Sequence, residues 1–313
     1  MGLRLKALLD EQVPLVRLQI FHVVYCLLIV IQFSYNFLGQ SQFLSLQLAS
    51  HERHLVLGVL QLPRLDSTAF FLVGLLFAAC LVLSTLGWRP PIFLFAAAAL
   101  YFLYFSQIFE LSYVNRKTNL IPLTLLLLAV TPGIERSGVR PLLRWLKGLP
   151  AALRGSAGPE PERVPGWPYR LYMLMISFVY LGAGISKLAN GGLAWASGHG
   201  FQTYLFQNYL WNDEAITRAV AETPLLVAAM AVATFIFELG FWIVAFLPQR
   251  WWGAFVVVGV GFHIGTGVLM SIQYWKYFLP SYAVFITPGA VEVVYRGIAA
   301  WLHPAQKSPR ALQ

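Results

Sequence analysis

Charged residues are scarce in this sequence. Only 11% of its 313 residues are Asp, Glu, Lys or Arg, whereas 58% are hydrophobic. A soluble domain carries about 25% charged residues, so a chain of this length has too few of them to cover a surface that faces water. The composition therefore excludes an ordinary soluble domain and predicts an all-α integral membrane protein whose surface lies in lipid. We expect a polytopic bundle of about eight transmembrane helices with interfacial helices, one of them basic and within residues 133–168.

Cysteine is nearly absent, and the common motifs of soluble enzymes are missing. The two cysteines, Cys26 and Cys80, lie in apolar segments, which excludes a disulfide framework. The sequence contains no Walker loop, GxGxxG, HExxH, CxxC or GxSxG motif. The nearest approach to a metal site is the cluster His51–His54. Two imidazoles without a third ligand at a recognisable spacing favour a solvated loop, so we expect no metal.

Long apolar segments are abundant instead. A helix needs about 20 residues to cross the hydrocarbon of a bilayer, and eight segments reach or approach that length. The fourth and the eighth are short, so each is either half of a broken helix or is extended by its flanks. The eight segments are residues 16–38, 68–86, 91–108, 119–130, 169–188, 224–247, 252–271 and 274–287.

The basic residues favour one orientation of these segments. With both termini cytoplasmic, 15 of the 22 Lys and Arg residues lie on the inner side and 7 on the outer side, and cytoplasmic loops are enriched in these residues. The formal charge of +9 is thereby assigned to topology, so we expect no nucleic-acid partner. We expect a bacterial plasma (inner) membrane protein with one transmembrane domain, 1–313, containing a basic cytoplasmic loop at 133–168, an outer aromatic loop at 189–223 and a tail at 291–313.

A lysine ends the fifth segment. A charge at that depth in the membrane is costly, so this lysine is a candidate functional residue. Lys187 follows Gly184 by one turn and Tyr180 by two turns on the same helix face. Trp195 and the aromatic stretch after it could roof a pocket over the lysine. Lys187 is either an anchor that reaches the membrane interface or a residue of such a site.

Two more ionisable residues lie in the middle of apolar segments. His263 is surrounded by glycines, including the GxxxG pair Gly261 and Gly265, and we expect a close contact of a neighbouring helix or a ligand with the Gly259–Gly267 stretch. The histidine either hydrogen-bonds across that contact or belongs to a site. Glu238 either pairs with a cation or stays protonated, because burial disfavours the carboxylate.

A family resemblance runs through the fifth segment and beyond. Its motif is Tyr180-x-Gly182-x-Gly184-x-x-Lys187-Leu188, followed by Trp195-x-x-Gly198. Looser matches are Thr131-Pro132-Gly133, Phe262-His263-x-Gly265 and Leu269-Met270. Over about residues 12–290 the chain resembles the HTTM (horizontally transferred transmembrane) domain, the membrane domain of vitamin K-dependent γ-glutamyl carboxylase and its bacterial relatives.

The resemblance implies a catalytic lysine and a quinone. In the carboxylase, the lysine that matches Lys187 is understood to deprotonate vitamin K hydroquinone, after which the oxygenated quinone abstracts the γ-proton of glutamate and CO2 adds. A vitamin K-like quinone or hydroquinone cofactor, or a lipid substrate, is therefore expected here. An apolar, glycine-lined site disfavours the ammonium form of lysine, which suits a base. The expected site consists of Lys187 and His263 as catalytic residues and Tyr180, Gly184, Trp195 and Glu238 as substrate-binding residues.

Two departures from the carboxylase leave two hypotheses. The carboxylase has a large lumenal β-rich region that binds propeptide and substrate, for which we expect a partner protein to substitute here. It also has a histidine shortly before its fourth segment, where this chain has Lys117 and Thr118. One hypothesis is a membrane enzyme, either a carboxylase-like lyase or ligase or another quinone-linked enzyme. The other is a non-catalytic membrane protein, such as a complex subunit or an immunity- or transport-like module.

The orientation is testable by cysteine accessibility. In a background that carries Cys26→Ser and Cys80→Ser, we expect Ser197→Cys to react with a membrane-impermeant maleimide in intact cells. Ser156→Cys should react only after the membrane is permeabilised, because basic loops stay in the cytoplasm. Labelling of Ser156→Cys from outside intact cells would overturn this orientation.

Overall fold

The computed structural model of the protein is dominated by helices. It describes residues 10–47, 65–109, 119–153, 162–212, 215–272 and 274–302. The cluster His51–His54 and the labelling position Ser156 lie outside these ranges.

Six helical segments are long and apolar enough to cross a bilayer, and many of their large hydrophobic side chains face outward, as contact with lipid requires. A pair of helices bent by 95° adds a seventh when the pair is counted as one span. The chain is thus a helical membrane protein, and its described part gives six or seven spans where the sequence predicts eight. The six segments are Leu15–Ser34, Ser67–Thr85, Pro90–Gln107, Trp167–Gly192, Pro224–Phe246 and Gln249–Met270.

The two shortest predicted segments do not form full spans. The fourth is α6 (Leu120–Ala129), whose 10 residues extend only about 15 Å along the helix axis. The eighth consists of α13 (Trp275–Phe278) and the 3-10 helix η4 (Pro280–Phe285), after which the chain bends into α14 (Pro288–Leu302). Both η4 and α14 begin with proline, which lacks the amide hydrogen that would continue the preceding helix.

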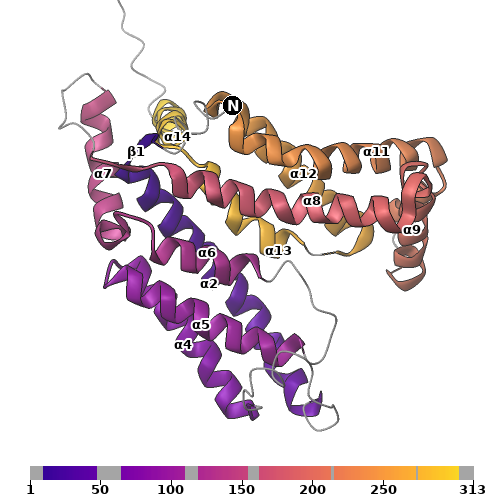
Figure 1. Ribbon diagram of the computed structural model, residues 1–313, viewed down its shortest axis with the longest axis horizontal. Helices are drawn as coiled ribbons and strands as arrows, with labels where there is room; N and C mark the ends of the chain where they lie inside the picture. Colours follow the sequence, from indigo (N-terminus) through magenta and orange to yellow (C-terminus); the bar gives the residue numbers. More distant parts are fainter. Residues whose placement is uncertain are drawn as a thin grey trace, which may run out of the picture.

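The helices form two groups that meet near β1 and α7 and diverge from there (Figure 1). The first group is α2 (Leu15–Gln47), α4 (Ser67–Thr85), α5 (Pro90–Phe109), α6 and α7 (Val139–Leu153). The second is α8 (Trp167–Ala196), α9 (His199–Asn212), α10 (Ala215–Ala221), α11 (Pro224–Gly240), α12 (Trp252–Met270) and α13. The connecting elements are β1 (Gln12–Pro14), β2 (Arg163–Pro165) and the 3-10 helices η1 (Ile134–Arg136), η2 (Phe241–Phe246) and η3 (Gln249–Trp251).

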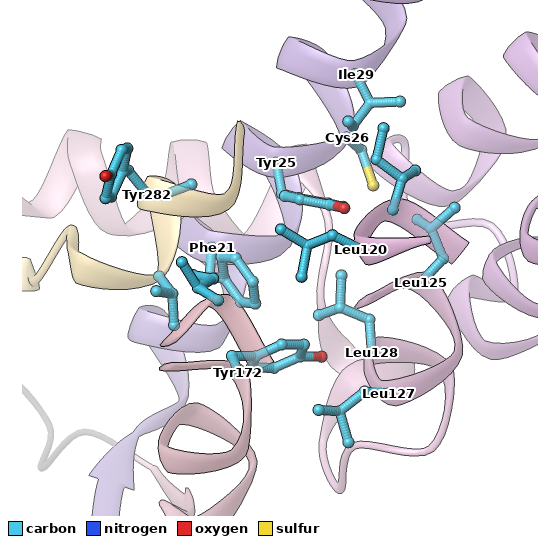
Figure 2. Packing of buried hydrophobic residues seen from close by; sticks show 14 of the residues in the cluster. Phe21, Tyr25, Cys26, Ile29, Leu120, Leu125, Leu127, Leu128, Tyr172 and Tyr282 are labelled. Atoms are coloured by element: carbon cyan, nitrogen blue, oxygen red, sulfur yellow. The ribbon is translucent and has the colours of Figure 1, made fainter. Parts of the chain in front are cut away.

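The core lies where α2 passes between the two groups. Phe21 and Tyr25 of α2 are almost completely buried. Figure 2 shows them beside Leu120 and Leu128 of α6 and Tyr172 of α8. The rings of Phe21 and Tyr172 meet edge to face, with centroids 4.6 Å apart, a favoured geometry for aromatic pairs. This packing joins α2 to both α6 and α8, and both of those helices border the site described below.

The all-α prediction misses one small sheet. β1 and β2 pair antiparallel, with Val13 opposite Val164, and they tie the start of α2 to the start of α8. Each strand has three residues and ends in proline. Such strands are too short for the alternation of polar and apolar residues that identifies a strand in a sequence.

The two long connections lie at opposite ends of α8 and are largely helical (Figure 1). Residues 133–168 contain η1, α7 and β2. Residues 189–223 contain the end of α8 together with α9 and α10. The predicted tail, residues 291–313, starts within α14, and apolar side chains of α7 and α14 pack against the start of α2.

The basic helix α7 has the two faces that a helix at a membrane surface requires. Leu142 and Leu149 are buried. Arg140, Arg144 and Lys147 are exposed, and their spacing places them on one side of the helix.

A buried histidine links three parts of the first group. In α2, the Nδ1 atom of His22 lies 2.9 Å from Ser137 Oγ, and its Nε2 atom lies 2.8 Å from Ser84 Oγ. Both ring nitrogens are therefore used in joining α2 to α4 and to the segment after η1. We interpret His22 as a structural residue, because both of its polar atoms already have protein partners.

The same junction yields a stability prediction. Gly138 has a φ of 148°, and a Cβ atom there would lie 2.7 Å from the Cα atom of Gly87. We expect Gly138→Ala to lower the free energy of unfolding by about 2 kcal/mol, because backbone would have to move. Gly148→Ala in α7 is the control, since no atom lies within 4 Å of its built Cβ. Equal thermal unfolding midpoints for the two purified variants would contradict the prediction.

Candidate functional site

Lys187 and Glu238 form an ion pair between α8 and α11. The Nζ atom of Lys187 lies 2.5 Å from Oε1 and 2.7 Å from Oε2 of Glu238. The Glu238 side chain is 4% exposed and the Lys187 side chain 22%. A charge at this depth is tolerated when an opposite charge and hydrogen bonds compensate it. Of the two states that the sequence leaves open for Glu238, the structure shows the cation pair, and the cation is Lys187.

Gly184 allows the two helices to approach closely at this point. A Cβ atom on Gly184 would lie 2.8 Å from Leu239 Cδ2 and 3.2 Å from Glu238 Cβ. A larger residue would therefore separate α8 from α11 one turn before Lys187. Gly182 differs, because no atom lies within 4 Å of its built Cβ. Gly184 therefore serves the contact between the helices, whereas Gly182 leaves open space.

A second polar group lies two turns away along α8. The Oη atom of Tyr180 is 2.5 Å from His263 Nε2 and 2.6 Å from Tyr282 Oη. The three residues are 2%, 2% and 5% exposed, in that order. They belong to α8, α12 and η4, so this hydrogen-bonded chain joins three elements. The His263 ring also stacks on Phe278, with centroids 4.6 Å apart.

The close approach predicted for the Gly259–Gly267 stretch occurs at Gly259, and not at the GxxxG pair. No atom lies within 4 Å of a Cβ built on Gly261 or Gly265. The packed face of α12 instead carries Gly259 and His263, and a Cβ on Gly259 would overlap the hydroxyl group of Tyr282. Residues four apart share a helix face, so the sequence contains two glycine-containing faces here. The neighbouring η4 covers the one that carries the histidine.

Both polar groups border one cavity of about 730 Å³. Pockets of this size bind small molecules, usually with apolar walls and a few polar groups that fix orientation. The polar residues described above, Tyr180, Lys187, Glu238 and His263, all line it. The remaining wall is largely apolar and comes from α6, α8, α9, α11, α12 and α13, for example Leu120, Leu123, Met175, Phe178, Phe201, Phe262 and Phe278.

Trp195 closes the cavity beside the lysine. The Nζ atom of Lys187 lies 5.2 Å from the centroid of the Trp195 ring, within the range of a cation–π interaction. Helix α8 is broken at Gly192, which has a φ of 50°, and Trp195 follows this break. Phe201 and Tyr204 of α9 line the cavity with it. The aromatic stretch after Lys187 thus borders the pocket, as the sequence predicts.

Sequence reasoning missed Tyr282. This residue lies two positions after Pro280 in a short apolar segment. Tyrosine is common where membrane segments meet water, so nothing in the local pattern distinguishes Tyr282 from an interfacial side chain. Its hydrogen bond to Tyr180 arises because η4 packs between α8 and α12.

Within the described ranges, no group of three His, Cys, Asp or Glu side chains could hold a metal ion. No family model matches the chain, and no curated protein or solved structure matches it significantly. The geometry of the cavity is therefore the basis for assigning a function.

The contrast between two glycines of α8 gives a prediction about the site. We expect Gly184→Leu to lower the free energy of unfolding by about 2 kcal/mol, because the added side chain overpacks the α8–α11 contact. Gly182→Leu should leave stability nearly unchanged, since its side chain enters the cavity. Thermal unfolding in detergent compares the two. A midpoint for Gly184→Leu equal to that of Gly182→Leu would show that the helices do not approach closely there.

Proposed function

We propose that this chain is a membrane enzyme in which Lys187 and Glu238 together remove a proton from a hydroxyl group of a hydroquinone-like or lipid alcohol. The observation that carries the proposal is an ion pair that lines a largely apolar cavity of about 730 Å³. The resemblance to the HTTM domain supports it independently, because it implies a basic function for Lys187 and a quinone-type substrate.

The ion pair can accept a proton without creating an isolated charge. The Lys187 ammonium first passes a proton to the Glu238 carboxylate, which gives a neutral amine and a carboxylic acid. The amine then takes the proton of the substrate hydroxyl. The result is a protonated Glu238, a Lys187 ammonium and a substrate anion held beside that ammonium. In a site of low dielectric, this contact stabilises the anion more strongly than water would.

The two polar groups of the cavity suit a ligand with polar atoms at both ends. Tyr180 and Lys187 are seven residues apart on one face of α8, which separates their backbones by roughly 10 Å. A hydroquinone ring presents hydroxyl groups on opposite edges. One could lie at Lys187 while the other hydrogen-bonds the chain of Tyr180, His263 and Tyr282. His263 would then act from the far edge of the substrate, and Phe178 and Phe262 would contact the ring.

We further propose the membrane placement that the sequence predicts. In it, α6 and the pair α13–η4 act as partial crossings that bring the number of passes to eight. The ends of the described chain, β1 and α14, then lie on the cytoplasmic side of a bacterial plasma membrane. The exposed basic face of α7 supports this side, because cytoplasmic segments are enriched in Lys and Arg.

One observation favours a non-catalytic function instead. Both carboxylate oxygens of Glu238 lie within hydrogen-bonding distance of Lys187, so the pair could serve only to hold α8 against α11. The two functions differ in what they require. A structural link requires opposite charges in either order, whereas proton removal requires an amine at position 187.

A naphthol probe can separate these possibilities, because its anion absorbs and emits at longer wavelengths than its neutral form. We expect the purified protein to bind naphthol and to show the anion spectrum at neutral pH. Lys187→Arg should abolish the anion spectrum, because arginine retains its proton at any accessible pH. Lys276→Arg is the matched control and should leave the spectrum unchanged.

The charge reversal Lys187→Glu with Glu238→Lys completes the test. It should restore the thermal stability that either single change removes, yet show no naphthol anion. An unchanged anion spectrum in Lys187→Arg would contradict proton removal by this lysine and would favour the structural function.

A further inference from the structure

A second cavity, of about 320 Å³, lies beside α12. His263 lines both cavities, and Tyr282 lines the smaller one beside it. The rest of its wall is apolar apart from Trp275 and comes from α12 and α13: Val260, Ile264, Gly267, Val268, Trp275 and Leu279. We call this cavity the lateral groove.

The lateral groove opens toward the lipid. Ile264 and Val268 are 58% and 47% exposed, and both belong to a segment that is long and apolar enough to span the membrane. Trp275 and Leu279, on the opposite lip, are exposed as well. In a bilayer these side chains contact hydrocarbon. A molecule that enters the groove therefore comes from the membrane, and it meets His263 and Tyr282 at the bottom.

We propose that the lateral groove binds the alkyl tail of the same substrate whose hydroxyl-bearing ring occupies the central cavity. This inference rests on the proposed function, because it assigns a tail to that substrate. An apolar wall selects hydrocarbon, and His263 lines both the groove and the central cavity. A cavity of about 150 Å³ accepts a benzene molecule, so the groove has room for roughly a dozen tail carbons.

Gly267 keeps the groove open. A Cβ atom there would lie 3.7 Å from Trp275 Cδ1, which is ordinary contact, so a larger side chain would occupy the space between α12 and α13. Gly259, one turn before His263, instead accommodates Tyr282. The two glycines thus place Tyr282 at the floor of the groove and leave its mouth free for a chain.

Two probes of the same chemistry test the proposal: naphthol, and naphthol that carries a dodecyl chain. Binding to the full-length protein in detergent is measured by naphthol fluorescence, with partition into protein-free micelles subtracted. We expect the tail to increase the affinity of the wild-type protein about tenfold. Ile264→Trp should remove this gain by filling the groove, while its affinity for tail-less naphthol stays unchanged and shows that it is folded.

Val257→Trp is the matched control. It lies two turns earlier on the same face of α12, is 71% exposed and does not line the groove, so it should keep the tenfold gain. Equal affinities of the wild-type protein for both probes, or a full tail effect in Ile264→Trp, would overturn the groove as the tail site and leave the proposed function standing. Failure of the wild-type protein to bind either probe would overturn both.

Discussion

The ion pair between Lys187 and Glu238 places two charges where hydrocarbon surrounds the protein, and neither would be stable there alone. Its geometry depends on the contact between α8 and α11, which depends in turn on Gly184. The same constraint recurs at the opposite end of the bundle. There the buried guanidinium of Arg17 lies 4.3 Å from the centroid of the Tyr169 ring and 4.7 Å from that of Trp252. At these two places, buried charge is compensated locally, by a counterion in one and by aromatic rings in the other.

Glycine has two opposite functions around the cavity. At Gly184 and Gly259 the missing side chain lets a neighbouring element come close, which brings Glu238 and Tyr282 into the site. At Gly182 and Gly267 it leaves volume that ligand could fill. The cavity thus arises from residues that close some contacts and residues that keep others open. Such an arrangement supports a binding function better than a bundle in which every small residue serves helix packing.

His263 is adjacent both to the site of the proposed reaction and to the groove by which substrate would enter from the bilayer. It lines both a central cavity with an ion pair and a lateral groove with hydrocarbon side chains. An amphipathic substrate dissolved in the bilayer could place its tail in one and its polar ring in the other. The water-poor surroundings strengthen the electrostatic effect of the lysine on a substrate anion. The hydroxyl group of Tyr180 orients the histidine without adding charge, and Tyr282 in turn hydrogen-bonds Tyr180.

The helical membrane class could be predicted from the residues alone, because long apolar segments and few charges permit little else. The sequence also indicates which ionisable residues lie at depth, since Lys187, Glu238 and His263 interrupt apolar segments. Its count of eight spans depended on the two short segments, and proline breaks one of them. It did not reveal the strand pair, whose residues are too few to show a period.

Which of these residues are partners depends on how the helices pack, which no local pattern specifies. Glu238 is 51 residues from Lys187, and Tyr282 is 102 residues from Tyr180, so no local spacing relates them. Tertiary packing also determines which glycine-containing face of α12 is covered. Gly259 and Gly261 each share a face with the residue four positions later, and they differ in whether η4 packs against them. A helical pattern specifies which residues share a face, but packing specifies what that face meets.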